Sequence, residues 1–472
     1  MSSAERNREW YIFTENRAAV IAQLERGACD GILPAARGFM DNFAEFCLEA
    51  GVLEVFESFR DPRARRSIPM FFFCNTLVYR PLFHLPRLKP IERTLFRSPY
   101  ILRQLGFNAQ QIAAGFYQTE TGTLPFSAQT IADAFARAEA ADFLENQQAM
   151  LRALWSYCPG QFQTALWAMD SVHFRVPRGA HTPAQEFKAC VLGVWQNQVV
   201  WPLLWLFVEP DEAEITVGRK LIAAAESVLG VGAIQHLLVD RGYLDGAWLT
   251  ELHQRGTRVT MGVREGMLIL EEMQNLSQIA GMKWETAAPP KLHVEPLPQR
   301  TIMSFTALEA EWATCEAPLS GCLIRDTYPD QVRYRGLVTT EPDIAACDIL
   351  RDDRLRWTEE EVFMTLTRYW HFDDLPPCRL GVAYALVHFT LVAFTLLGFY
   401  LQETDAAAEI TSWNMAPPPL PLPERELAVY AGPYFTLLLP SELITIILKH
   451  IDAWQANQEQ LLMALRYAEG NT

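Results

Sequence analysis

Three acidic positions in this chain have the surroundings of metal-binding carboxylates. Asp240 follows the apolar run Leu238-Val239 and precedes the turn-forming Arg241-Gly242, so a buried strand would deliver it to the edge of a sheet. Asp170 ends a second apolar run in the same way, and Glu359 to Glu361 lie in a helix-like segment. Oxygen ligands suit Mg²⁺, and two such ions can activate the attacking oxygen and stabilise the leaving oxygen at a phosphodiester.

The apolar pattern also predicts the elements that would position these acids. The predicted strands cover 165–174, 187–195, 199–208, 234–240 and 258–263, and the predicted helices cover 214–229 and 247–253. Three neighbouring strands followed by helix, strand, helix and strand indicate an α/β fold with a mixed sheet and flanking helices.

The rest of the chain is predicted to fall into further parts. Residues 1–160 carry apolar residues at helical spacing, with Ser127 as a helix cap, and are expected to form a helical, DNA-binding region. Residues 161–264 begin the α/β domain, and 331–400 complete it with a strand at 332–339 and the acid-bearing helix. Between them, the proline-containing residues 265–330 predict an inserted β-rich subdomain. Residues 401–472 predict a proline-rich linker and a helical C-terminal region.

Composition indicates a globular protein of more than one domain. The chain has 472 residues, of which 50% are hydrophobic and 20% are charged. Its nine cysteines are scattered, which favours a reducing cytoplasm over a disulfide framework, and Cys315 and Cys322 are expected to be core thiols. No secretory signal opens the N-terminus.

The charge distribution is uneven. A net charge of −16 argues against a simple nucleic-acid binder. The segment from Arg60 to Arg103, however, has ten basic residues, including Arg65 and Arg66, against only two acidic ones. It also contains Phe71, Phe72, Phe73, Tyr79 and Phe83. A basic patch with aromatic residues is typical of a DNA-backbone contact surface, and the alternative is a solvated charged face over a helical core.

The apolar segment from Leu380 to Tyr400 is long enough to span a membrane. Its polar positions, among them His388, and the acidic Glu403 and Asp405 that follow it argue against a membrane anchor. We therefore expect a buried central helix and no membrane partner.

Taken with the three acids, residues from about 160 to 400 resemble the DDE transposases of bacterial insertion sequences. The resemblance is strongest at Trp167–Ser171, Val239–Tyr243 and Arg356–Phe363, and it points to the branch with a Tyr-x2-Arg-x3-Glu-x6-Lys signature. It implies an RNase H-like catalytic domain in which Asp170, Asp240 and Glu360 bind two Mg²⁺ ions, with Mn²⁺ as a substitute.

The same resemblance implies what the protein acts on. Water would cleave double-stranded DNA at transposon ends, and the freed 3′-hydroxyl would then attack target DNA. A homodimer in the DNA complex and a cytoplasmic, nucleoid-associated location in bacteria are further expectations.

The family pattern places the last acid at Glu360, and helical geometry offers a check. At about 100° per residue, Glu360 lies at the edge of the apolar stripe formed by Phe363, Leu366 and Trp370. Glu359 lies in the middle of that stripe and is the rival candidate, whereas Glu361 is expected to be solvated.

Several basic residues are candidate DNA contacts: Arg356, Arg241, Lys188, Arg65 and Arg66. For Arg356 the alternative role is an ion pair with Asp352 or Glu360. For Lys188 the alternative is a solvated position at the end of a strand. Trp357 is expected to lie in the core. The signature's Tyr and Lys fall on Asp353 and Thr367, so a DNA-binding relative that no longer cuts remains the alternative function.

Overall fold

A computed structural model of the chain describes residues 13–34, 36–63, 68–107, 111–112, 117–119, 122–162, 166–178, 183–289, 297–403, 411, 415–417, 426–456, 458, 461–462 and 464–465. The chain divides into two compact units, each assembled from segments far apart in sequence. Unit 1 comprises Met1–Ala138, Tyr369–Thr404 and Ala416–Thr472, and unit 2 comprises Glu139–Arg368 and Asp405–Met415.

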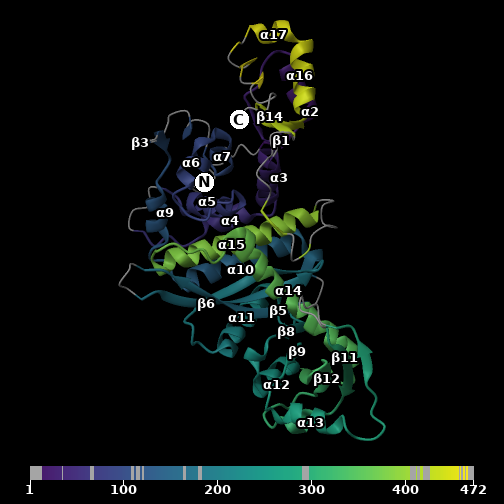
Figure 1. Ribbon diagram of the computed structural model, residues 1–472. Coiled ribbons are helices and arrows are strands. Elements are labelled where there is room, and N and C mark those ends of the chain that lie inside the picture. Colours follow the sequence, from purple (N-terminus) through teal and green to yellow (C-terminus); the bar gives the residue numbers. More distant parts are fainter. Residues whose placement is uncertain are drawn as a thin grey trace. The chain divides into compact units, whose positions relative to one another are not determined.

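Unit 2 is built on a nine-stranded mixed sheet in the order β10-β11-β12-β13-β9-β8-β5-β6-β7. Figure 1 shows β5, β6, β8, β9, β11 and β12 as one continuous row in teal and green. The strands are β5 (Leu166–Val176), β6 (Gln185–Gln196), β7 (Val199–Val208), β8 (His236–Val239), β9 (Arg258–Gly262), β10 (Glu285–Ala287), β11 (Gln299–Phe305), β12 (Ser320–Thr327) and β13 (Val332–Thr339). The helices are α10 (Ala140–Tyr157), η2 (Pro159–Phe162), α11 (Glu214–Leu229), η3 (Arg241–Tyr243), α12 (Gly246–Gln254), α13 (Leu268–Leu276), η4 (Glu309–Glu311) and α14 (Ala346–Trp370, with its last two residues in unit 1).

The central five strands have RNase H-like topology. β5, β6 and β7 form an antiparallel meander, after which β8 pairs in parallel with β5 and β9 in parallel with β8. In chain order the arrangement is third, second, first, fourth, fifth, with α11 and α12 as the crossovers between parallel strands. Such crossovers are needed because parallel strands cannot be joined by a hairpin. The predicted fold, a mixed α/β sheet with flanking helices, is confirmed.

The segment between the two parts of this domain is continuous with the central sheet. β13 pairs antiparallel with β9 from Leu337 opposite Gly262 to Thr339 opposite Thr260, and β12, β11 and β10 follow outward. It also contains α13, which the sequence pattern did not reveal. The predicted β-rich insertion therefore extends the sheet instead of standing apart from it.

Two helices cover opposite faces of the sheet at β5. On one face, Ala168 and Leu238 form a cluster with Val200, against which Leu355 of α14 packs. On the other face, Met169 lies next to Gly218 of α11, where a β-carbon would meet the Met169 sulfur at 3.4 Å. Because side chains alternate along a strand, residues two apart on β5 share the same helix as a neighbour.

Unit 1 is mainly helical. Its elements are β1 (Thr14–Glu15), α2 (Arg17–Leu24), β2 (Gly31–Pro34), α3 (Ala36–Glu49), α4 (Val52–Glu57), α5 (Met70–Leu82), α6 (Ile91–Thr94), η1 (Leu95–Arg97), α7 (Pro99–Gln104), β3 (Tyr117–Thr119), β4 (Gly122–Leu124), α9 (Ala128–Phe135), α15 (Leu380–Glu403), β14 (Leu427–Ala431), β15 (Tyr434–Leu438), α16 (Pro440–Lys449) and α17 (Ile451–Gln455). Ser127 caps α9, as expected, by accepting from the backbone N–H of Thr130.

α15 is the buried helix of unit 1, packed against α3, α5 and α9. Within the described part of the chain it is the one helix long and apolar enough to cross a membrane, a test that a core helix also passes. Its surroundings agree with the expectation of a buried central helix.

The C-terminal region differs from the helical expectation because it begins with a β-hairpin. β14 and β15 pair with each other and with N-terminal strands in the order β1-β15-β14-β2. Gly432, at φ 58°, takes the left-handed conformation that the short turn requires. The Gly432-Pro433 pair between two apolar runs is a local signal for this hairpin, and the helical prediction did not take it into account.

Candidate active site

Asp170 and Asp240 lie at the same level of two adjacent parallel strands. The last paired residues of β5 and β8 are Met169 and Val239, and each aspartate follows directly. Neighbouring strands are about 4.8 Å apart, so the two carboxylates start from adjacent backbone positions. By strand alternation they share the face of Ala168 and Leu238, which is the face covered by α14.

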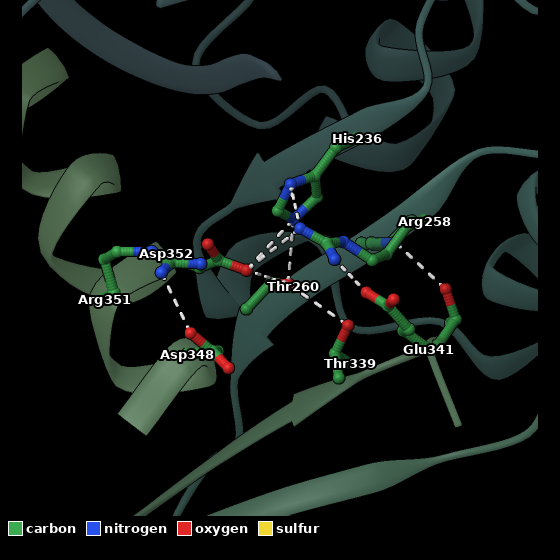
Figure 2. A network of polar contacts seen from close by, with 10 residues as sticks. His236, Arg258, Thr260, Thr339, Glu341, Asp348, Arg351 and Asp352 are labelled. Atoms are coloured by element: carbon green, nitrogen blue, oxygen red, sulfur yellow. Dashed lines mark hydrogen bonds and ion pairs between the residues drawn. The ribbon is translucent and has the colours of Figure 1, made fainter. Parts of the chain in front are cut away.

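A polar network sets the position of α14 along this face (Figure 2). Asp352 of α14 lies 3.3 Å from His236 Nε2, 3.4 Å from Arg258 Nη2 and 3.3 Å from Thr260 Oγ1. His236 and Arg258 are the first residues of β8 and β9. Eight residues of helix rise about 12 Å, and four residues of strand about 13 Å. A helix anchored at Asp352 near the start of β8 thus carries Glu360 to the level of Asp240.

His236 is neutral within this network. Arg258 Nη2 donates to its Nδ1 at 2.5 Å, so the ring proton resides on Nε2, which lies 3.0 Å from Thr260 Oγ1. Burial lowers the pKa of His236 to about 3, and the positive charges of Arg258 and Arg351 act in the same direction. Arg258 is also paired with Glu341, so the anchor joins β8, β9, α14 and the segment after β13.

Arg356 holds Glu360 one turn along α14. Arg356 Nη1 donates to Glu360 Oε1 at 2.9 Å, and Arg356 Nε lies 3.9 Å from Asp353 Oδ1. The Arg356 side chain is buried, whereas that of Glu360 is 34% exposed. The alternative role of Arg356, an ion pair with Glu360, is therefore the one observed, and it does not favour Arg356 as a direct DNA contact.

The pKa of Asp170 reflects the charges of the other two acids. Burial raises the pKa of Asp170 to about 7, against the opposing effects of the Ser171 backbone N–H and of Arg356. The negative charges of Asp240 and Glu360 also act to raise this pKa. The charges of Asp240 and Glu360 therefore reach Asp170, and a shared metal site of the three acids stays a prediction.

Glu359 is the most deeply buried acid of the group. It is 1% exposed, in the middle of the apolar stripe of α14 as helical geometry predicts. Burial raises its pKa well above the usual range, and the negative charge of Asp170 adds to this rise. Neither carboxylate oxygen has a hydrogen-bond partner of normal geometry among the residues that the structure describes, although the Asp170 backbone N–H lies close enough to lower the pKa of Glu359 slightly against this rise.

Lys188 lies on the opposite face, in a separate network. Its ammonium is buried, donates to the Glu212 carbonyl at 2.6 Å and lies 3.9 Å from Glu214. Ser171 donates to Glu214 at 2.5 Å, and a β-carbon on Gly242 would overlap the Glu214 carboxylate. The expectation that Lys188 lines a DNA channel does not fit these surroundings, because its charge is satisfied inside the fold.

The other candidate DNA contacts have varied surroundings. Arg241 is exposed directly after Asp240. Trp357, expected in the core, is 46% exposed, and the Arg356 guanidinium lies over its ring at 5.4 Å. Arg65 and Arg66 lie outside the described residues.

The basic segment does not present its aromatic residues to solvent. All five of the aromatic residues that suggested a contact surface are buried: Phe71, Phe72, Phe73, Tyr79 and Phe83. Arg80 is buried as well and donates to the carbonyls of Pro86 and Leu386 and to Thr390. The helical-core alternative therefore describes this part of the segment, while Arg87 remains exposed.

The carboxylates of these acids are chemically suited to bind a divalent cation, but they are not gathered around a common point. Among the described residues, no three His, Cys, Asp or Glu side chains already gather closely enough to hold a metal ion. Glu359 has two buried oxygens that lack a well-formed hydrogen bond among the described residues, and the partly buried Asp170 lies close to Asp240. Oxygen donors left without partners are what a hard cation satisfies.

Comparisons with known proteins give one structural neighbour to report. The fold is similar to that of a piggyBac transposase in a synaptic complex with hairpin DNA, with a TM-score of 0.39 and 9% sequence identity over 82% of this chain and 80% of that chain. No protein-family model and no curated protein sequence matches the chain.

Proposed function

We propose that this chain is a DDE transposase that cleaves DNA at transposon ends and joins the freed 3′-hydroxyl to target DNA. The observation that carries the proposal is the alignment of Asp170 and Asp240 on paired parallel strands of an RNase H-like sheet, beneath a helix that supplies a glutamate. This arrangement suits phosphodiester chemistry because several oxygen ligands converge from rigid elements.

In this proposal Asp170, Asp240 and a glutamate of α14 bind two Mg²⁺ ions, for which Mn²⁺ can substitute. The ions supply activation of the attacking oxygen and stabilisation of the leaving oxygen. In cleavage, a water oxygen bonds to phosphorus, the P–O3′ bond breaks, and the proton of the water passes to the leaving 3′-oxygen. In joining, that 3′-hydroxyl attacks a target phosphorus, and one phosphodiester bond replaces another.

The partners would be double-stranded DNA, both transposon ends and target. In this proposal Arg241, which is exposed next to Asp240, would contact the DNA backbone, and Arg65 and Arg66 remain candidates from sequence. A homodimer bridging two ends and a bacterial, nucleoid-associated location are also part of the proposal.

The test is a plasmid carrying the DNA that borders the coding sequence on both sides. The purified full chain should nick or cut it at the borders with Mg²⁺ or Mn²⁺ and not with EDTA. Asp170→Asn and Asp240→Asn should each reduce the rate at least about a hundredfold, whereas Asp330→Asn, an exposed control, should not. Equal cutting by the wild type and Asp170→Asn would refute the proposal.

A second candidate is a DNA-binding protein of transposase descent that does not cut. One observation in its favour is the hydrogen bond of 2.9 Å from Arg356 to Glu360, because it engages an oxygen of the expected third metal-binding acid. Another is that Thr367 stands at the position of the signature's Lys. Salt-sensitive binding of the bordering DNA, with no cleavage under any divalent ion, would identify this function.

A further inference from the structure

Glu359 and Glu360 are neighbours on α14 with opposite surroundings. Glu360 is partly exposed and accepts a hydrogen bond from Arg356 at 2.9 Å. Glu359 is 1% exposed, and both of its oxygens lack a hydrogen-bond partner of normal geometry among the described side chains and backbone groups. Glu360 therefore has a well-formed hydrogen bond within the protein, whereas Glu359 has none of normal geometry and only the backbone of Asp170 close by.

An unsatisfied carboxyl group inside a core is costly. Burying a polar group without a hydrogen bond costs roughly 1–3 kcal/mol by mutational measures, and an apolar side chain in the stripe beside Val362 and Leu366 would avoid this cost. The surroundings of Glu359 suggest a reason for an acid at this position. Among the charged groups near it, Asp170 has the largest effect on its pKa. Asp170 in turn lies close enough to Asp240 to feel its charge.

We propose that Glu359, not Glu360, is the α14 carboxylate that binds the divalent cation together with Asp170 and Asp240. This inference rests on the proposed function and departs from the family pattern, which selects Glu360. The role of Glu360 is then to hold Arg356, whose charge lies close to Asp170. Glu360 is in that sense a positioning residue.

The experiment is calorimetric titration of the metal-free full chain with Mn²⁺, with and without a DNA duplex. The variants are Glu359→Gln, Glu360→Gln and Asp170→Asn, with Glu361→Gln as the neighbouring control. Glu359→Gln should weaken Mn²⁺ affinity at least about tenfold, as should Asp170→Asn. Glu360→Gln should weaken it by less than Glu359→Gln does, and Glu361→Gln should leave it unchanged.

A second variant separates loss of binding from loss of folding. Glu359→Asp keeps the charge but shortens the side chain by one methylene, so it should also weaken Mn²⁺ binding. Glu359→Gln should unfold in urea at or above the wild-type midpoint when chelator is present, because a neutral amide replaces a buried acid that lacks partners.

The outcomes distinguish this inference from the proposed function. If Glu360→Gln loses Mn²⁺ and Glu359→Gln retains it, the inference is overturned while the transposase proposal stands. If the wild type binds no Mn²⁺ even with DNA, both are overturned. If Glu359 variants lose the cation while Glu360→Gln keeps it, Glu359 is the ligand.

Discussion

Asp352 and Glu360 lie two turns apart on α14 and reach opposite ends of the same strand, β8. Asp352 contacts His236, the first residue of that strand, while the charge of Glu360 acts on Asp170, beside its far end. The rise of the helix between them matches the length of the strand to within about 1 Å. The polar network around Asp352 thus sets the level of α14 at which its glutamates approach the ends of the two apolar runs that carry Asp170 and Asp240.

Removing the arginine of this anchor should destabilise unit 2. Arg258→Met leaves the buried Asp352 without its cation partner, for a loss of about 2–4 kcal/mol in urea unfolding. Arg175→Met, whose partner Glu186 is on the surface, should change stability by less than about 0.5 kcal/mol. Equal effects of the two substitutions would contradict the anchoring role.

Two buried histidines should make the protein less stable in acid. Burial lowers the pKa of His236 and of His388 to about 3, whereas an unfolded chain protonates histidine below about 6.5. Between these values the unfolded state binds more protons, so stability falls as pH decreases from about 6.5 toward 3. The urea midpoint should drop between about pH 7.5 and about pH 5, and His236→Gln should reduce the drop. A drop unchanged by this substitution would exclude His236 as a cause.

Gly242 and Glu214 should be energetically coupled. A methyl group at Gly242 would displace the Glu214 carboxylate from Ser171, and losing that hydrogen bond should cost about 1–2 kcal/mol. In a Glu214→Ala background the clash is absent, so Gly242→Ala should then cost little. A double-mutant cycle in urea measures the coupling, and additive effects would rule out the contact.

A buried ion pair joins the outer strands of the sheet. Arg300 donates to both Asp326 oxygens, at 2.7 and 2.6 Å, across β11 and β12. Asp326→Asn should destabilise by about 3 kcal/mol because it leaves a buried guanidinium uncompensated. The double substitution Arg300→Met with Asp326→Leu should recover most of that loss, and no recovery would show that the charges themselves are needed.

Arg80 should matter for stability and not for DNA. Arg80→Met removes donors to two carbonyls and a hydroxyl in unit 1, which should cost about 2–4 kcal/mol. The salt dependence of DNA affinity should stay unchanged, because a buried guanidinium releases no counterions from phosphate. Arg87→Gln, on the surface, serves as the opposite control. A shallower salt slope in Arg80→Met would show that Arg80 contacts DNA.

Local patterns were sufficient where an element is defined by its own residues. The helix at 214–229 and the strands at 199–208 and 332–339 match their predicted bounds, because turn residues and apolar runs mark both ends. The level of Asp170 and Asp240 followed from two apolar runs that each end in an acid. The burial of Glu359 followed from helical spacing alone.

Relationships between distant segments were not visible in the sequence. The residues around Arg80 in the sequence do not predict its partners on α15, which lie far along the chain. In the same way, the sequence around Arg258 does not predict its contact with Asp352. The β13–β9 pairing was missed for the same reason, since antiparallel register between segments far apart leaves no periodic trace. Trp357 was misplaced because a large aromatic is usually buried, yet here it packs over Arg356.

Because β13 joins the sheet beside β9, the site has an order of assembly. A growing chain that has emerged as far as Gly262 already contains both aspartates and the segments that form β5 and β8. It lacks the α14 glutamates and also the surface on which the start of α14 rests, formed by Ile302, Ile324 and Leu337. The outer strands and α14 are therefore the last parts of this domain's sheet and site to be synthesised.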